Sequence, residues 1–521
     1  MPTLDPVVSI LDVVAPEDYS LRTPTDKEQE VVQAVFTSFR VSADDRNKAF
    51  EYFDNQTLIE YINDSVRRFV TNVDIRENIE DWQAIVHNPF TRNKVLAILS
   101  KVMRVLPIAE FTARGDEDFR KASILNDLYL YTEELDDYEE IMTFFLLEAI
   151  VKGTAIGYEG YSTKEKKIKV VKNVNDEISI AEKKVTRNKL FASVVPLEEF
   201  YPSSVSIRTV KEMPYCFWSR QMPYSKFMMD WGGFSRARIV QPKMSYGKDE
   251  IRPYYADYIS TNVLEGNVEV IRYYNKENDE YIILANGIWL NPIMTGKEKS
   301  TEEISPLPFN HKELPFFDVK FDFYGADFFY GKSLPDRLKS LQDVLNVLNN
   351  MMLDQSFLSV FSPILTSGFD PIEDDYLRPG RRIPIDTQGL PLNQAVMKMD
   401  VGTPSGWHQY ILQYTQKIME ESSIDGVSSG QAGVGGRTTA QEIRVAADGV
   451  ASILGLFGRM INVGVKRKAF LRASNILQFG TDPSSPLIEG VMGENGREDF
   501  AKAFGVYPIH NTVLSTGKRG T

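Results

Sequence analysis

A single long helix, predicted between Ser333 and Pro363, sets the strongest limit on the architecture of this chain. Ser333 is a favoured N-cap residue, and Pro335 falls in the first turn, where its missing N–H costs nothing. Asp336 places a carboxylate near the positive end of the helix dipole. Pro363 restricts the preceding residue to extended geometry and ends the helix. About 28 helical residues would span about 42 Å, so the rest of the chain must be arranged around a rod of that length.

Apolar residues lie on more than one side of this predicted helix. They recur at steps of three and four and form two adjacent stripes, the first being Leu338, Leu341, Leu345, Leu348 and Met352, and the second Val344, Val347, Met351 and Leu358. A helix with two apolar stripes needs packing partners on two sides.

A second helix is predicted over residues 405–422. Its apolar residues are spaced by four, three and four: Trp407, Ile411, Tyr414 and Ile418. Residues 362–403 between the two helices are rich in Pro, Gly and Asp and contain short β-like runs at 364–365, 382–385 and 395–397. We expect a compact tip that joins two helices. An ordinary antiparallel helix pair inside a core fits the periodicity equally well.

Length and composition bound the class of protein. A chain of 521 residues is too long for one hydrophobic core, so about two to four domains or one elongated subunit is expected. The 72 acidic residues exceed the 59 basic ones, which disfavours tight binding of nucleic acid through its phosphates but does not exclude weak contact. One cysteine, Cys216, excludes an internal disulfide and fits a reducing compartment. No signal peptide and no membrane span are expected, because no apolar run approaches about 18 residues.

The N-terminal third is predicted to be helical. Residues 1–44 are expected to form a surface arm with a short amphipathic piece at 28–39. From residue 45 onward, helical patterns predict a packing domain with segments at 49–70, 82–87, 93–106, 116–133 and 138–152.

The pattern changes to β at Gly153. Residues 153–161 and 168–171 predict a hairpin with a charged turn at 163–167, and its basic residues are typical of a solvated face, with DNA contact as the alternative: Lys164, Lys166, Lys167, Lys169 and Lys172. Further strands are predicted at 191–195, 216–220, 268–274, 281–285 and 288–290, with a turn at Asn286-Gly287 and a short helix at 224–231. The middle of the chain is therefore an antiparallel α+β region.

Glycines mark the start of the C-terminal part: Gly426, Gly430, Gly433, Gly435 and Gly436. A capping box at 439–442 then predicts a helix over 438–463, which Gly449, Gly455 and Gly458 weaken, so close packing or a kink is expected. A separate basic helix is predicted at 465–477. Short mixed structure follows it.

The sequence offers no constellation for catalysis. Residues 430–435 have the glycine spacing of a phosphate-binding loop, but Gly436 and Arg437 stand where that loop needs Lys and Ser or Thr. The four histidines are far apart, which disfavours zinc, and no Gly-x-Ser-x-Gly elbow is present. We therefore expect a protein that is not an enzyme and has no metal or cofactor, and we interpret the glycine run as a flexible loop.

Several motifs, in order along the chain, resemble the portal proteins of tailed bacteriophages, also called head-to-tail connectors. The run Phe329-Tyr330-Gly331-Lys332-Ser333, followed by Leu341-Gln342, Asn346 and Asn349-Asn350, is similar to the family's entry into its first stem helix. Other similar pieces lie at 144–161, 194–202, 286–290 and 426–442, so the resemblance covers about residues 45–477. The family's larger members continue into a long C-terminal helical barrel that this sequence does not predict, so the barrel is absent or the chain is truncated.

The resemblance implies an α+β, elongated subunit assembled as a ring. Its parts would be an N-terminal arm (1–44), a wing of a helical block and antiparallel β pieces (45–329), two long stem helices (330–361 and 405–423) and a small clip (362–404). A tunnel loop (424–437), a tunnel helix (438–463) and a C-terminal wing or crown part (464–521) would complete it. The two apolar stripes then acquire a reason, because a stem helix in a ring packs on its own partner and on a neighbouring subunit.

The resemblance also implies partners and a location. The ring, a dodecamer in this family, would occupy one capsid vertex of the virion after assembly in the host cytoplasm. It would conduct double-stranded DNA during packaging and ejection and dock the terminase large subunit, the major capsid protein and tail adaptor proteins. DNA would pass residues of the tunnel loop and the basic helix: Arg437, Gly430, Gly433, Gly435, Gly436, Lys466, Arg467 and Lys468. The apolar residues at 338–352 and 407–418 would pack between subunits.

Two alternative functions also fit the sequence. Another virion scaffold or tail-adaptor protein could also be built from helices and small sheets. A nucleotide-dependent enzyme would need the phosphate-binding signature that is broken at Gly436 and Arg437.

Overall fold

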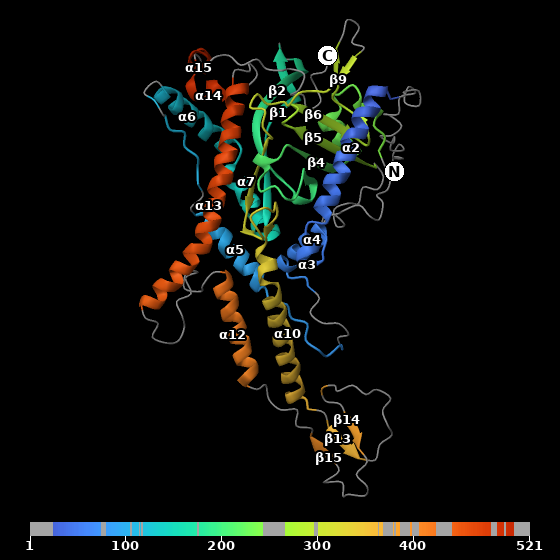
Figure 1. Ribbon diagram of the computed structural model, residues 1–521, viewed down its shortest axis with the longest axis vertical. Helices are drawn as coiled ribbons and strands as arrows, with labels where there is room; N and C mark the ends of the chain where they lie inside the picture. The colour runs from blue at the N-terminus through green and yellow to red at the C-terminus, as the bar shows by residue number, and fades with distance from the viewer. Residues whose placement is uncertain are drawn as a thin grey trace. The chain divides into compact units, whose positions relative to one another are not determined.

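The protein is α+β, as predicted (Figure 1). It divides into two compact units. The computed structural model describes residues 24–73, 80–104, 107–113, 115, 118–174, 177–242, 266–295, 301–362, 364–367, 379, 382–385, 396–398, 406–423, 440–480, 487–493 and 496–504. The first unit comprises Met1–Asn63, Val105–Lys332 and Phe457–Thr521, and the second comprises Asp64–Arg104 and Ser333–Leu456. Residues 64–104 therefore belong with the long helix, whereas the sequence predicted them in the same part as residues 105–329. In the described part of the chain, no helix has both the length and the apolar character to cross a membrane.

An antiparallel five-stranded sheet lies in the first unit. Its order is β3 (Phe200–Pro202), β4 (Tyr215–Pro223), β5 (Asn267–Asn275), β6 (Glu280–Ala285) and β7 (Ile288–Trp289). The predicted strands from β4 to β7 are confirmed. Asn286 and Gly287 both have positive φ, as the tight turn between β6 and β7 requires.

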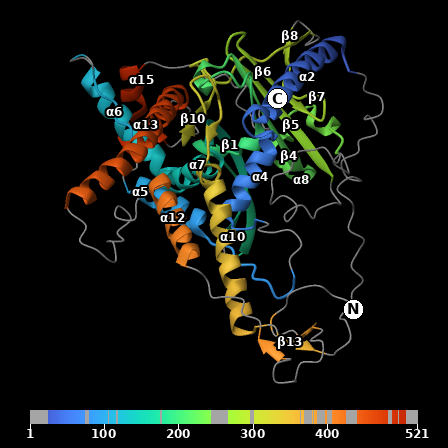
Figure 2. The same cartoon turned by 60° about the horizontal axis from the view of Figure 1, so that its bottom comes forward.

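Helix α2 (Asp26–Asn47) packs against this sheet (Figure 2). Its N-cap Thr25 accepts a hydrogen bond from the Glu28 N–H, and Val31 and Val35 are buried among apolar residues of β4, β5 and β6. The predicted surface arm is therefore wrong for residues 24–44, because the apolar side of this amphipathic helix covers a sheet. Residues 1–23 of the predicted arm lie outside the described residues.

A second sheet has the order β10 (Phe316–Lys320), β1 (Thr154–Val174) and β2 (Glu177–Val195). β1 pairs with β2 in one continuous register from Ile156 opposite Val195 to Val174 opposite Glu177. The turn predicted at 163–167 is wrong, since those residues continue the strand. They contain no Gly, Pro or Asn that would favour a turn, and β2 offers a partner of matching length.

Two glycines allow two backbone segments of this unit to approach each other closely. Gly153, with φ of 85°, follows α7 (Tyr138–Lys152), and Gly331 lies against it. A Cβ atom on Gly331 would stand 2.3 Å from the Gly153 carbonyl oxygen. The Gly331 N–H donates to the Thr154 hydroxyl at 2.7 Å. The glycine of the Tyr330-Gly331 motif is thus required by a close backbone approach.

The remaining helices that lie wholly or partly in the first unit mostly match the predicted segments. α6 (Phe119–Leu135), α7 and α8 (Tyr224–Trp231) were predicted, whereas the segment 49–70 forms α3 (Glu51–Asp54) and α4 (Leu58–Phe69), since Asn55 is left-handed. Short elements complete the unit: η3 (Leu197–Glu199), η4 (Val210–Glu212), η5 (Ala237–Ile239), β8 (Ile293–Thr295), β9 (Thr301–Glu303), β11 (Asp322–Phe323) and β12 (Gly331–Lys332).

One continuous helix, α13 (Ala440–Phe479), replaces the two helices predicted at 438–463 and 465–477. Gly464 at the predicted break packs on β10, and a Cβ atom there would lie 2.3 Å from the Val319 Cγ2 atom. The glycine therefore permits close packing instead of ending the helix. Further along, Ile476 and Phe479 of α13 share a core with α6, α14 (Leu487–Met492) and α15 (Gly496–Phe504).

The second unit contains the long helix. α10 (Leu334–Val360) begins as predicted, with the Ser333 hydroxyl accepting the Asp336 N–H at 3.1 Å. α12 (Gly406–Ser423) runs beside it in both views (Figures 1 and 2). The chain between them forms the predicted β runs, which pair in the order β14 (Arg382–Ile385), β13 (Ile364–Ser367) and β15 (Val396–Lys398). α5 (Phe90–Met103) packs against α10 and matches the helix predicted at 93–106.

Candidate functional site

A polar ladder runs along one face of α10. Gln342, Asn346, Asn350 and Asp354 are spaced by four residues and are all buried. Residues 84–91, here called the strap, face this ladder. The sequence predicted a helix at 82–87, but residues 84–89 are not helical. The ladder and the strap both belong to the second unit.

The ladder binds the backbone of the strap. Its side-chain oxygens accept N–H groups in order along the helix: Ala84 to Asp354 at 2.7 Å, Val86 to Asn350 at 2.7 Å, Asn88 to Asn346 at 3.1 Å and Thr91 to Gln342 at 3.3 Å. Two amide groups also donate back, from Asn350 to the Val86 carbonyl and from Gln342 to the Asn88 carbonyl, each at 3.0 Å. The helix side chains therefore satisfy backbone groups that a neighbouring strand would otherwise pair.

The spacing of the two elements explains this match. Four residues of an α-helix advance about 6.0 Å, and two residues of an extended chain advance about 6.6 Å. Ala84, Val86 and Asn88 are successive alternate residues, so each meets the next rung. Pro89 also restricts Asn88 to extended geometry. The missed signal in the sequence was the run of amide and carboxylate residues at every fourth position along one face of α10.

The start of α10 is fixed by charged and polar contacts with residues 64–69 of α4. The buried Arg68 guanidinium donates two hydrogen bonds, of 2.7 and 3.2 Å, to the Asp343 carboxylate and also contacts Asp64 at 3.1 Å. The hydroxyls of Ser65 and Ser333 lie 3.0 Å apart and are buried. Paired, charge-assisted bonds of this kind hold a helix in a defined position.

The residues predicted to pack between subunits occupy different environments. Leu338 and Leu345 are fully buried within the single chain, so the prediction that they pack between subunits is wrong. Leu341, Leu348, Met352 and Ile418 are half-buried. Ile411 and Tyr414 are exposed, and the Trp407 side chain lies outside the described residues. Other large apolar residues of the two helices and their ends are also exposed, and together with Ile411 and Tyr414 they form what we call the apolar α10–α12 set: Val344, Met351, Phe357, Val360, Phe361 and Tyr410.

The residues predicted to meet DNA are only partly described. Gly430, Gly433, Gly435, Gly436 and Arg437 lie outside the described residues. Lys466 is exposed on α13. Arg467 is half-buried and contacts the Glu313 carboxylate at 3.2 Å. Lys468 has 1% of its surface exposed.

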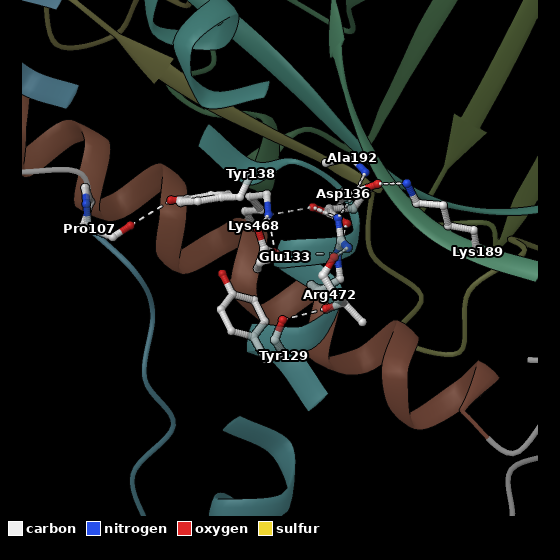
Figure 3. A network of polar contacts seen from close by, with 11 residues as sticks. Pro107, Tyr129, Glu133, Asp136, Tyr138, Lys189, Ala192, Lys468 and Arg472 are labelled. Carbon is white, nitrogen blue, oxygen red and sulfur yellow. Dashed lines mark hydrogen bonds and ion pairs between the residues drawn. The ribbon is translucent and has the colours of Figure 1, made fainter. Parts of the chain in front are cut away.

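Lys468 belongs to a buried ion network in the first unit (Figure 3). Its ammonium group donates to Glu133 and lies 3.5 Å from Glu159. Arg472, one turn later, contacts both Glu159 and Asp136 at 2.7 Å. Burial raises the pKa of the Glu159 carboxyl, and the Arg472 charge opposes that rise. The prediction of a DNA contact is therefore wrong for Lys468, because its charge is buried and neutralised by carboxylates.

Within the described ranges, no group of three or more His, Cys, Asp or Glu residues is placed to hold a metal ion. Cys216 is buried, and burial raises the pKa of its thiol well above the ordinary value. Comparison of the sequence with protein-family models gives no match, and comparison with curated proteins gives no significant match either.

Proposed function

We propose that this protein is a portal subunit. Copies of it would form a ring, a dodecamer by the family resemblance, at one vertex of a viral capsid. The ring would conduct double-stranded DNA in both directions and dock the terminase large subunit, the major capsid protein and tail adaptors. In this proposal α10 and α12 are the stem helices, and β13, β14 and β15 form the clip. The start of α13 is the tunnel helix, and the ring carries out no catalysis of its own.

The observation that carries the proposal is the exposure of the apolar α10–α12 set. In the single chain 48% of Met351, 54% of Tyr414 and 68% of Val360 are exposed to solvent. Removing apolar surface from water contributes about 25 cal/mol per Å², so helices with many exposed large apolar residues gain stability from a further partner. A ring supplies that partner from the next identical subunit.

One face of α10 is occupied within the chain and the opposite face is exposed, which favours packing of a second copy on that face. The ladder on one face is occupied by the strap, which belongs to the same unit. At about 100° per residue, Val344 and Met351 lie roughly 150° around the helix from Asn346. Both are exposed. The side of α10 away from the ladder is therefore available to a second copy.

The order of the elements supports the same proposal. A capped helix of 27 residues, a three-stranded sheet, a second helix of 18 residues and a helix of 40 residues follow one another. This order agrees with the stem, clip, stem and tunnel-helix order that the motifs at 329–350 and 426–442 imply. Among the residues predicted to face DNA whose side chains the structure describes, Lys466 is the exposed one.

The experiment is a measurement of assembly with a matched pair of variants. Native mass spectrometry and negative-stain imaging of the purified protein should give a closed ring with a central channel. Met351→Asp should shift the population toward monomers, because a charge at a packed interface costs several kcal/mol per copy. Met229→Asp on α8, where 83% of the side chain is exposed, should leave the ring intact. Monomers of the unaltered protein at high concentration, or equal effects of the two variants, would contradict the proposal.

A further inference from the structure

The outer part of the β1–β2 hairpin is a two-stranded ribbon. β10 pairs with β1 over Thr154–Tyr158 only, and Tyr161 and Leu190, which lie opposite each other, are the last pair in the core cluster. We call residues 163–174 and 177–188 the outer ribbon. Among the described residues, its strands pair only with each other.

The outer ribbon is basic in an acidic protein. Residues 162–189 contain nine Lys or Arg and four Asp or Glu, whereas the whole chain has a net charge of −13. The continuous register assigns each residue to one of two faces, since alternate residues of a strand lie on opposite faces. One face, here called the basic face, has no acidic residue between the Lys164 and Lys172 positions and carries these basic residues: Lys164, Lys166, Lys172, Lys183 and Arg187.

The opposite face is nearly balanced. It carries Lys167, Lys169 and Lys184 together with Glu165 and Glu182, and Lys169 lies directly opposite Glu182. On the basic face, Lys164 lies directly opposite Arg187. On the opposite face Lys167 likewise lies directly opposite Lys184. The two faces therefore differ in net charge, which between the Lys164 and Lys172 positions is +5 on the basic face and +1 on the other, and not in the pairing of like charges. Solvation alone gives no reason for most of the unbalanced charge to fall on one face.

We propose that the basic face of the outer ribbon binds the phosphate backbone of duplex DNA. A two-stranded β-ribbon has the width that the major groove accepts, and the eight residue steps from Lys164 to Lys172 extend about 26 Å, or several phosphates along each strand. Four of the five charges are lysines, which contact phosphates as point charges and read no base sequence. Binding is therefore independent of sequence and sensitive to salt. This site does not depend on ring formation, because one subunit carries all five residues.

The test uses the full chain, a fluorescein-labelled 30-base-pair duplex and anisotropy titrations at several salt concentrations. Five phosphate contacts predict that log K falls with log salt at a slope of about −4.5. The triple variant K164Q/K183Q/R187Q should bring the slope to about −1.8 and weaken binding by up to about 500-fold at 0.1 M salt. The triple K167Q/K169Q/K184Q changes the chain charge by the same amount on the opposite face and should change the affinity less than threefold.

A second readout needs no variant. Lysine acetylation of the unaltered protein, followed by mass spectrometry, should show DNA-dependent protection at Lys164, Lys166, Lys172 and Lys183 and not at Lys167, Lys169 and Lys184. Absence of saturable binding at 50 mM salt, equal losses from the two triples, or equal protection on both faces would overturn the proposal. Preference for poly-glutamate over DNA would overturn it as well and assign the face to an acidic protein. If the protein forms a ring but does not bind DNA through the basic face, only the DNA-binding proposal is refuted. If it binds DNA through this face but stays a monomer, only the ring proposal is refuted.

Discussion

Replacing Asn350 by alanine should loosen the strap without altering the apolar packing of α10. The side chain of Asn350 is fully buried and makes two hydrogen bonds to one strap residue, accepting the Val86 N–H at 2.7 Å and donating to its carbonyl at 3.0 Å. It also donates to the Asn346 carbonyl at 2.8 Å. Alanine removes all three bonds and has good helix propensity, so the change acts mainly on the strap.

The size of the effect follows from these bonds. A net hydrogen bond contributes about 0.5–1.5 kcal/mol, and a buried polar group that loses its partner costs about 1–3 kcal/mol. Val86 is 44% exposed in the folded chain, so water can replace some of the lost pairing. We therefore expect local opening of the strap to become easier by about 2 kcal/mol, which corresponds to an exchange rate about 30-fold higher.

Hydrogen–deuterium exchange resolved to a peptide covering residues 82–91 measures this directly. Asn349→Ala is the matched control, since Asn349 is the preceding residue of the same helix and its side chain makes none of the hydrogen bonds to the strap. The Asn350 variant should accelerate exchange at Val86 and Ala84, and the Asn349 variant should not. Unchanged exchange in the Asn350 variant, or equal acceleration in both, would refute the idea that the ladder holds the strap.

Three further predictions concern the first unit. Lys468→Met should lower the free energy of unfolding, measured by chemical denaturation, by about 3 kcal/mol, because it leaves the buried Glu133 carboxylate without its closest cation. The control Lys466→Met, on the exposed side of α13, should change it by less than about 0.5 kcal/mol. Similar losses in the two variants would contradict this prediction. In the same assay, Gly331→Ala should lower the free energy of unfolding by about 2 kcal/mol or more, since its Cβ would collide with the Gly153 carbonyl. Gly325→Ala, where a Cβ meets nothing within 4 Å, should leave the free energy of unfolding nearly unchanged. A Gly331 variant as stable as the unaltered protein would refute the close approach. Burial lowers the pKa of His311 to about 3, so the folded state keeps this residue neutral while the unfolded chain protonates near pH 6.5. Stability should therefore fall by about 2 kcal/mol between pH 7 and pH 5 from this residue, and His311→Asn should remove that part of the pH dependence; an unchanged pH profile would contradict the shift.

Elements with local signals could be predicted from the sequence. α10 begins at the Ser333-Leu334-Pro335-Asp336 signature and shows apolar steps of three and four, and α7 and α8 have equally local patterns. The turn between β6 and β7 followed from Asn286-Gly287 alone. In these cases the residues that decide the structure are neighbours in the chain.

Elements decided by distant partners were predicted wrongly. The strap was predicted as a helix because its ladder lies more than 250 residues later in the sequence. β1 was ended too early because only the register with β2 shows how far it continues. α13 was divided at Gly464 because a glycine that allows contact with β10 looks, in sequence, like one that ends a helix.

The two apolar stripes of the long helix could be predicted from the sequence, but not which of them stays exposed. Leu338 and Leu345 of the first stripe, predicted to pack between subunits, are buried within the chain, whereas Val344 and Met351 of the second stripe are exposed. Gln342, Asn346 and Asn350 carried the family resemblance but had no structural role until the strap was seen against them. Lys468 was misassigned because basic residues on a helix are usually solvated, and its carboxylate partners lie on other elements.

The most direct test of the portal proposal is the mass and shape of the particle that the purified full chain forms. Native mass spectrometry combined with electron microscopy should show a closed ring of identical copies around an open channel, with α10 of each copy contacting its neighbour. A particle with the mass of one 59.3 kDa chain, at concentrations where rings of this size persist, would contradict it.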